Sequence, residues 1–218
     1  MKSLNQLIQQ YGTPNILIDS FDQSSKRYAI WGFDAIFQIN KKGTFLNEDL
    51  IEGDCLDIFQ KIINQWKFEN KKQKLACIGF LSYDFKQNIY KHLNFIEDSD
   101  CFPYVWFCKP KHIEEYDLSN CKHSNVSGNL EVLQDIMDFS NYEKQIDKIK
   151  SFLKNGDVYQ INYTDFKKFK SSFNNSFDMY NTLRTKAKPK EGFYLRTNNF
   201  NILSFSPESF IKVKNNII

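Results

Sequence analysis

Residues 155–164 read Asn-Gly-Asp-Val-Tyr-Gln-Ile-Asn-Tyr-Thr, and residues 204–210 read Ser-Phe-Ser-Pro-Glu-Ser-Phe. These two stretches decide how the rest of the chain is interpreted. Ahead of the first, apolar residues recur at helical spacing, which predicts an amphipathic helix. A capping box at Ser140 and Glu143 predicts its start, and Gly156 predicts its end near Asn155.

After Gly156 the period of the sequence changes to two, which predicts a strand. One face of it would carry the apolar residues Tyr159, Ile161 and Tyr163, and the other face the polar residues Gln160, Asn162 and Thr164. Amides and hydroxyls donate and accept hydrogen bonds without the desolvation cost of a full charge, which suits a polar pocket. A solvated strand face is the alternative, and the local residues alone favour it.

Composition excludes several classes of protein. The 218 residues are 41% hydrophobic and carry a net charge of +3, and only three of the basic residues are arginines. Base-reading surfaces favour arginine, so nucleic acid is not expected as a partner. No apolar run approaches the roughly 20 residues of a membrane helix, and residues 1–6 lack the uninterrupted apolar core of a signal peptide. We therefore expect a cytoplasmic protein.

The five cysteines are irregularly spaced and odd in number, which predicts reduced thiols. Four residues have metal-capable side chains in one region: Cys108, His112, Cys121 and His123. Their spacing matches no common zinc pattern, which usually contains a close pair of cysteines. Buried or half-exposed cysteines in strands are the better interpretation, and no metal site is assigned.

The coarse pattern predicts an α+β fold, with strands in antiparallel succession and helices inserted between them. Helices are expected at residues 4–11, 54–67, 140–155 and 177–186. Strands are expected at residues 15–20, 28–33, 35–39, 75–83, 104–108, 112–116, 193–196, 202–205 and 210–214. Gly79, inside the 75–83 strand, predicts a close backbone approach. The last strand has no returning partner before the sequence stops, which leaves an unpaired edge.

The residues 156–162 and 202–210 together resemble the chorismate-utilising enzymes, namely component I of aminodeoxychorismate synthase and of anthranilate synthase. Weaker similarities lie upstream, at residues 16–20, 78–84 and 102–107. The resemblance implies a large α+β fold of antiparallel sheets packed face to face, with helices outside. It covers nearly the whole chain, but only the first part of the family's length.

The resemblance also implies a division of the chain and a truncation. Residues 1–138 would form the N-terminal region of component I, and residues 139–218 would begin the chorismate-binding catalytic domain, incomplete at its C-terminus. The implied reaction replaces the ring hydroxyl of chorismate with ammonia from a glutamine amidotransferase partner. Mg²⁺ would hold the substrate carboxylate, through family ligands that lie beyond this chain.

Glu208 is the one residue that the resemblance carries over to a catalytic position. The glutamate of Ser-Pro-Glu does acid–base work in the family, which suits a carboxyl group if partial burial raises its pKa towards the working pH. The residues Gln160, Asn162, Thr164 and Ser206 would line the substrate pocket. Local sequence alone offers an alternative, a helix that begins at Ser206 with Pro207 in its first turn.

Residues 78–84 and the compact N-terminal region favour the aminodeoxychorismate branch, which serves folate and para-aminobenzoate synthesis. Residues 188–192 depart from the tryptophan-feedback segment of anthranilate synthases. An anthranilate synthase fragment is the alternative. A second alternative is a non-catalytic binding module, in which Ser20 and Pro189 line a tryptophan-type pocket. The chain alone is expected to be inactive.

Overall fold

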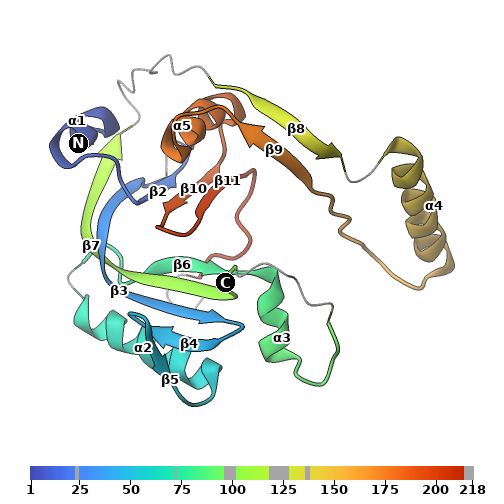
Figure 1. The fold of residues 1–218 in the computed structure, drawn as a ribbon, viewed down its shortest axis with the longest axis horizontal. Coiled ribbons are helices and arrows are strands. Elements are labelled where there is room, and N and C mark those ends of the chain that lie inside the picture. The colour runs from blue at the N-terminus through green and yellow to red at the C-terminus, as the bar shows by residue number, and fades with distance from the viewer. Residues whose placement is uncertain (23–24, 72, 96–101, 118–127, 136–137, 214–218) are drawn as a thin grey trace. The chain divides into compact units, whose positions relative to one another are not determined.

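The structure is a computed structural model that describes residues 1–22, 25–71, 73–95, 102–117, 128–135 and 138–213 (Figure 1). Two compact units make up the chain. The first unit contains Met1–Lys122 and Leu183–Ile218, and the second contains His123–Thr182. Helices and strands are mixed in both, so the expected α+β class is confirmed.

Within the described residues, nine strands of the first unit form one sheet, in the order β1-β7-β3-β2-β10-β11. Strands β4 and β5 extend this sheet from β3, and β6 pairs with β7. All of these pairs are antiparallel except β1 with β7. The strands are β1 (Lys2–Ser3), β2 (Ile16–Asp19), β3 (Tyr28–Asn40), β4 (Gly43–Leu46), β5 (Asp49–Ile51), β6 (Ile78–Leu81), β7 (Val105–Asp117), β10 (Glu191–Arg196) and β11 (Asn201–Ser206).

The helices of the first unit are α1 (Leu4–Tyr11), α2 (Cys55–Glu69), the 3₁₀ turn η1 (Tyr83–Phe85) and α3 (Lys86–Ile89). Helix α5 (Ser176–Ala187) begins in the second unit and ends in the first. The bounds predicted for α1 are confirmed, and Ser3 and Gln6 form its capping box. Helix α2 was predicted to begin at Asp54, and Asp54 is its N-cap. It ends at Glu69, two residues past the predicted end at Lys67.

Strands β3 and β7 run side by side through the first unit and are longer than predicted (Figure 1). The sequence predicts two strands in place of each, but β3 is continuous through a bulge between Phe33 and Ala35. The break predicted at Pro110 is also wrong. Pro110 pairs with Phe33 next to this bulge, where a residue without a backbone N–H is tolerated because the ladder is already disrupted.

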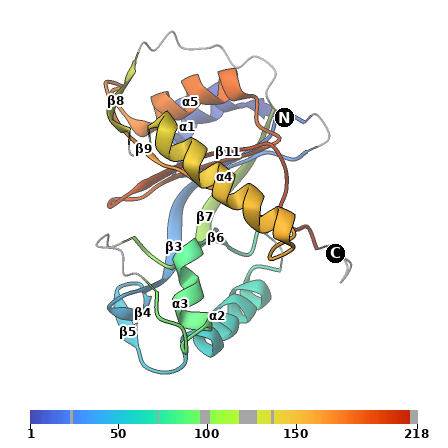
Figure 2. The ribbon, with the colours of Figure 1, turned by 90° about the vertical axis from the view of Figure 1, so that its right-hand side faces the viewer.

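The two faces of the sheet bury different cores, because successive residues of a strand point to opposite faces. On one face Ile62 and Trp66 of α2 pack with Phe37 and Val105, and Figure 2 shows α2 beside the part of the sheet that contains β4 and β5. The other core contains Ile16, Ile30, Trp106, Cys108 and Leu195. Helix α2 is therefore held by direct packing on the sheet.

Gly79 in β6 lies against the backbone of β7. A Cβ atom at this position would be 2.0 Å from the Trp106 carbonyl oxygen and 2.6 Å from the Phe107 Cα. The predicted close approach is confirmed. Strand β6 itself is shorter than the predicted 75–83 strand, because the chain turns into η1 directly after it.

The second unit contains α4 (Phe139–Asn155) and a two-stranded antiparallel sheet of β8 (Leu130–Asp135) and β9 (Lys167–Ser171). Asp138, not Ser140, is the N-cap of α4, and its side chain accepts from the Asn141 N–H at 2.8 Å. The predicted end is confirmed, because Gly156 adopts the left-handed conformation with φ 80°. Its N–H donates to Leu153 and that of Asp157 to Phe152, which completes a Schellman motif.

Candidate functional site

Ser206, Pro207 and Glu208 lie where β11 ends in the first unit. Ser206 is the last residue of the strand and pairs with Glu191. Its Oγ donates to the Glu208 carbonyl oxygen at 2.8 Å, so the hydroxyl closes a tight turn over Pro207. No helix follows within residues 207–213, so the alternative of a helix start is wrong.

Glu208 is exposed, and no salt bridge is formed by its carboxylate within the described residues. An exposed carboxylate accepts hydrogen bonds and exchanges protons with water. Acid–base catalysis near neutral pH would need additional burial, which the described residues do not provide. The catalytic role of Glu208 therefore stays a prediction.

The strand predicted from Phe210 to Lys214 is wrong over the described residues 210–213, which are irregular and exposed. Phe210 is 96% exposed and Val213 is 61% exposed. Neither residue has a neighbouring strand to pair with among those described, and a strand needs a partner for its backbone N–H and C=O groups. Residues 214–218 lie outside the described residues.

The strand predicted after Gly156 is also wrong, because residues 157–166 have no regular secondary structure. Tyr159 is 97% exposed, although Ile161 and Tyr163 are partly buried. The ring of Tyr163 lies 6.0 Å from that of Tyr142 on α4. The alternation thus holds for two residues, but no described strand pairs with this segment to make a ladder.

The polar residues Gln160, Asn162 and Thr164 are all exposed. They belong to the second unit, whereas Ser206 and Glu208 belong to the first. Gln160, Asn162 and Thr164 lie on one irregular segment of the second unit. Ser206 and Glu208 lie on one turn of the first unit. Their shared role in a substrate pocket stays a prediction.

Ser20 and Pro189 are neighbours in the first unit. Both are buried, and the N–H of Phe21 donates to the Pro189 carbonyl oxygen at 2.9 Å. The Ser20 Oγ accepts from the Asp22 N–H at 3.0 Å, which places it in a local turn. The structure thus joins the two residues predicted for a tryptophan-type pocket, but it does not test ligand binding.

A buried ion pair beside Ser20 was not predicted from the sequence. The Asp19 side chain is fully buried, and Arg184 of α5 donates to its Oδ2 at 2.5 Å. Tyr116 donates to Oδ1 at 2.9 Å, and the backbone N–H of Ser20 donates to it at 3.0 Å. Asp19 and Arg184 are 165 residues apart, so local patterns could not pair them.

The described residues with metal-capable side chains do not form a metal-binding cluster. No group of three or more His, Cys, Asp or Glu among the described residues could hold a metal ion. Cys121 and His123 lie outside the described residues. Cys55, Cys77 and Cys108 are free, as predicted, and burial raises the pKa of the Cys108 thiol. Mg²⁺ is usually held by one or two carboxylates and retained waters, and its binding by this protein stays a prediction.

No described helix is long and apolar enough to cross a lipid bilayer.

Comparisons with known proteins agree with the two motifs. No curated protein is significantly similar to this chain. Its fold is similar to the crystal structure of anthranilate synthase component I from Streptococcus pneumoniae TIGR4, with a TM-score of 0.59 and 16% sequence identity. The similarity covers 88% of this chain and 52% of that one, so the chain spans about half the length of this structure. The model of the chorismate binding enzyme family matches residues 13–218, and the chain belongs to that family.

Proposed function

We propose that this chain supplies the first part of an aminodeoxychorismate synthase component I. The substrate is chorismate, whose ring hydroxyl is replaced by ammonia to give 4-amino-4-deoxychorismate. A glutamine amidotransferase subunit delivers the ammonia in the cytoplasm. The observation that carries the proposal is the turn at Ser206 and Glu208 in a chain of the chorismate binding family.

In this proposal Glu208 exchanges a proton as the ring hydroxyl departs. The turn at the end of β11 supports this role, because the Ser206 hydroxyl is engaged by the Glu208 backbone and leaves the carboxylate available. Family ligands beyond residue 218 would hold Mg²⁺, which would supply positive charge for the substrate carboxylate. The amides of Gln160 and Asn162 and the hydroxyl of Thr164 hydrogen-bond the substrate or support its pocket.

The uncovered apolar surface supports a second part of the proposal, that further polypeptide completes the site. The matched fold extends well beyond this chain, which spans 52% of it. Phe210, two residues after Glu208, is 96% exposed, and Tyr159, directly before Gln160, is 97% exposed. Burial of such aromatic side chains normally stabilises a fold. Further polypeptide would cover these residues and dehydrate Glu208.

The experiment incubates the purified chain with chorismate, an ammonium salt and Mg²⁺ and separates the products chromatographically. We expect no conversion by the chain alone, because the metal ligands and the proposed covering polypeptide are absent. Appearance of aminated product would overturn this incompleteness. The adjacent DNA gives an independent check. In aminodeoxychorismate synthases the lysine of a Pro-Ile-Lys-Gly-Thr motif attacks the chorismate ring, so a reading frame that continues with this motif would support that branch.

Anthranilate synthase component I is the second candidate, and the fold similarity to that enzyme is the observation that favours it. The two activities give different products when the chain is assayed together with its continuation. Anthranilate is fluorescent and is released with pyruvate, whereas 4-amino-4-deoxychorismate retains the enolpyruvyl group. Fluorescent product would replace our proposal with this candidate. In either case Glu208→Gln should abolish turnover and Ser209→Ala should not.

A tryptophan-type binding module is the third candidate, and it is favoured by the proximity of Ser20 and Pro189. Calorimetry with tryptophan would give saturable heat, which Ser20→Ala would weaken and Ser209→Ala would leave unchanged. An absence of heat would exclude this candidate.

A further inference from the structure

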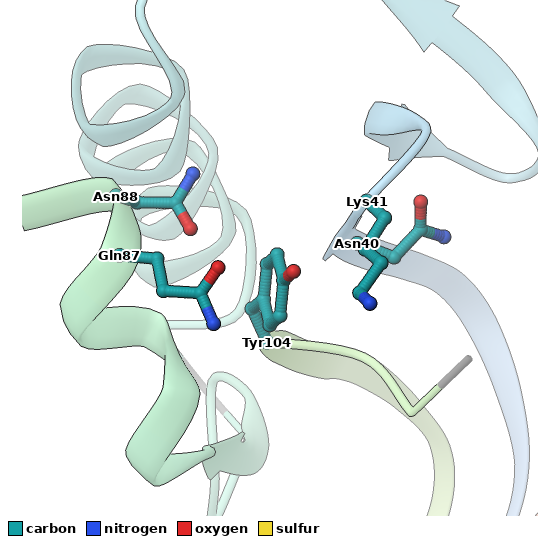
Figure 3. A pocket seen from close by; sticks show the side chains of 5 residues that line it. All are labelled: Asn40, Lys41, Gln87, Asn88 and Tyr104. Atoms are coloured by element: carbon teal, nitrogen blue, oxygen red, sulfur yellow. The ribbon is translucent and has the colours of Figure 1, made fainter. Parts of the chain in front are cut away.

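The described residues contain a pocket in the first unit and an exposed apolar helix face in the second. The pocket has a volume of about 440 Å³ and a polar lining, shown in Figure 3, which consists of Asn40, Lys41, Gln87, Asn88 and Tyr104. Water can hydrate an open polar pocket, whereas an apolar helix face is unfavourable in water. The helix face is therefore the stronger sign of a missing partner.

That face belongs to α4, which carries a continuous apolar stripe. Its members are Phe139, Tyr142, Ile146, Ile149 and Leu153. They follow one another at steps of three and four residues in turn, which is the spacing of the a and d positions of a heptad. Phe139 is 76% exposed, Tyr142 is 45% exposed and Leu153 is 40% exposed. The described residues thus leave most of the stripe uncovered.

The charges beside the stripe are complementary to those of a second, antiparallel copy of the same helix. Glu143 and Lys150 occupy the e positions of the heptad, and an antiparallel pair brings the e positions of the two helices together. Because such a pair has two-fold symmetry, Glu143 of each copy faces Lys150 of the other. The opposite flank carries the uncharged residues Gln145 and Phe152. A parallel pair would instead bring Glu143 close to the Asp138 cap, which has the same charge.

The outer face of α4 is suited to water. Its residues are all exposed, and they are Lys144, Asp147, Lys148, Ser151 and Lys154. An anionic lipid surface is a less suitable partner, because helices that lie on such surfaces carry mainly lysine and arginine on the polar face. In α4 the acidic side chains of Glu143 and Asp147 interrupt the lysines. The charge pattern therefore favours a second copy of the helix over a membrane.

We propose that α4 pairs with α4 of a second copy of this chain, as a short antiparallel coiled coil. The apolar stripes of the two helices cover each other, and two Glu143–Lys150 ion pairs flank them. The stripe spans about two heptads, fewer than the three or four that indicate a coiled coil from sequence alone, so the pairing is weak. At the low protein concentrations of circular dichroism the chain is mostly single. The inference does not depend on the proposed function.

Sedimentation equilibrium of the whole chain over a wide range of concentrations tests the pairing. We expect the mass to rise from that of one copy towards that of two copies as the concentration increases. Ile146→Lys places a charge in the centre of the stripe and should weaken pairing by more than about tenfold. This variant should still fold, because no residue of α4 is buried in the single chain, and circular dichroism checks its helix content.

Two charge reversals test the antiparallel arrangement. Glu143→Lys makes lysines face lysines across the pair, and Lys150→Glu makes glutamates face glutamates. Each variant alone should pair about tenfold more weakly than the unchanged chain, since two attractive contacts become repulsive. An equimolar mixture of the two variants restores opposite charges on both sides and should recover the original affinity to within about threefold.

Lys148→Glu is the matched control, because it reverses the same charge on the outer face of the same helix and should leave pairing unchanged. A mass of one copy at every concentration would overturn the proposal and leave the stripe to a different partner. Pairing that survives Ile146→Lys would place the interface elsewhere. Pairing that Lys148→Glu weakens as much as Lys150→Glu does, or a mixture that pairs no better than its components, would also contradict the proposal.

Discussion

Helices α2 and α4 have similar amphipathic patterns and very different surroundings. Both are amphipathic and both start at an aspartate cap, Asp54 and Asp138. Helix α2 buries Ile62 and Trp66 against the nine-stranded sheet of the first unit. Helix α4 buries no residue, and the described side chains of β8 and β9 are exposed as well. An apolar stripe therefore predicts a helix, but not that the same chain covers it.

This difference has a thermodynamic meaning. Most of the stability of a short helix in a protein comes from packing of its apolar face, and a lone two-stranded sheet is marginal in water. The first unit has two apolar cores and should unfold cooperatively. The second unit should open more easily.

Loss of the buried Asp19 carboxylate should have the largest effect and should reduce the stability of the first unit. Asp19→Ala leaves the Arg184 cation buried without its carboxylate, and such a change costs about 3–5 kcal/mol. Urea unfolding followed by tryptophan fluorescence measures it, because Trp31, Trp66 and Trp106 all belong to the first unit.

Two further variants serve as controls for this pair. Lys26→Ala removes an exposed contact with Glu115 at 3.9 Å and should cost less than about 1 kcal/mol. The double variant Asp19→Leu with Arg184→Met removes both charges and should recover part of the loss. Equal destabilisation by Lys26→Ala and Asp19→Ala would contradict the structure.

A matched pair of isoleucines tests the comparison directly. Ile62→Ala on α2 empties a core position and should cost about 2–5 kcal/mol. Ile149→Ala on α4 removes a half-exposed side chain and should cost less than about 1 kcal/mol. Far-UV circular dichroism during urea unfolding detects both helices. A large loss from Ile149→Ala would mean that α4 is packed in solution and would break the comparison.

Two glycines separate steric crowding from backbone conformation. Gly79→Ala pushes a Cβ onto the backbone of β7 and should cost about 1–3 kcal/mol in the tryptophan-detected transition. Gly156→Ala meets no atom within 4 Å, and only its positive φ makes it unfavourable, by about 1–2 kcal/mol. That cost should appear in helicity and not in tryptophan fluorescence. A tryptophan-detected effect of Gly156→Ala would contradict the separation of the two units.

The smallest effect concerns the cap of α2. Hydrogen bonds from Lys91 and from the backbone N–H groups of Leu56 and Asp57 hold the pKa of Asp54 below the usual value of an aspartate. The charged cap therefore stabilises the fold above the pKa of the unfolded aspartate, and the contribution is lost as pH falls through the folded pKa. Asp54→Ala should therefore lower the melting temperature slightly at neutral pH, and the difference should vanish in acid. A difference that grows on acidification would contradict this sign.

Local patterns predicted elements whose signals are complete within a few residues. The bounds of α1, the Gly156 cap, the hairpin of β10 and β11 and the close approach at Gly79 are all confirmed. The errors occur where a strand forms or continues only if another segment of the chain pairs with it. The 157–166 segment has the period of a strand but no described neighbour, and β3 continues through its bulge because β7 pairs with it on both sides.

The candidate site also combines features that local sequence predicts with features that depend on distant residues. Residues 156–162 and 202–210 were enough to indicate the chorismate binding family, because a motif is a local property, and the family match confirms it. Three features could not be predicted from local sequence. They are the turn that joins Ser206 to Glu208, the ion pair between Asp19 and Arg184, and the buried Asn88 Oδ1 without a hydrogen-bond partner.

The sequence by itself determined the α+β class, the bounds of α1, the end of α4 and the family, since helical period, capping residues and motifs act over a few positions. Only the tertiary structure decided which amphipathic helix is buried, which strands extend through their bulges and which charges meet. These depend on segments far apart in the chain, whose contacts form only when the loop between them has closed.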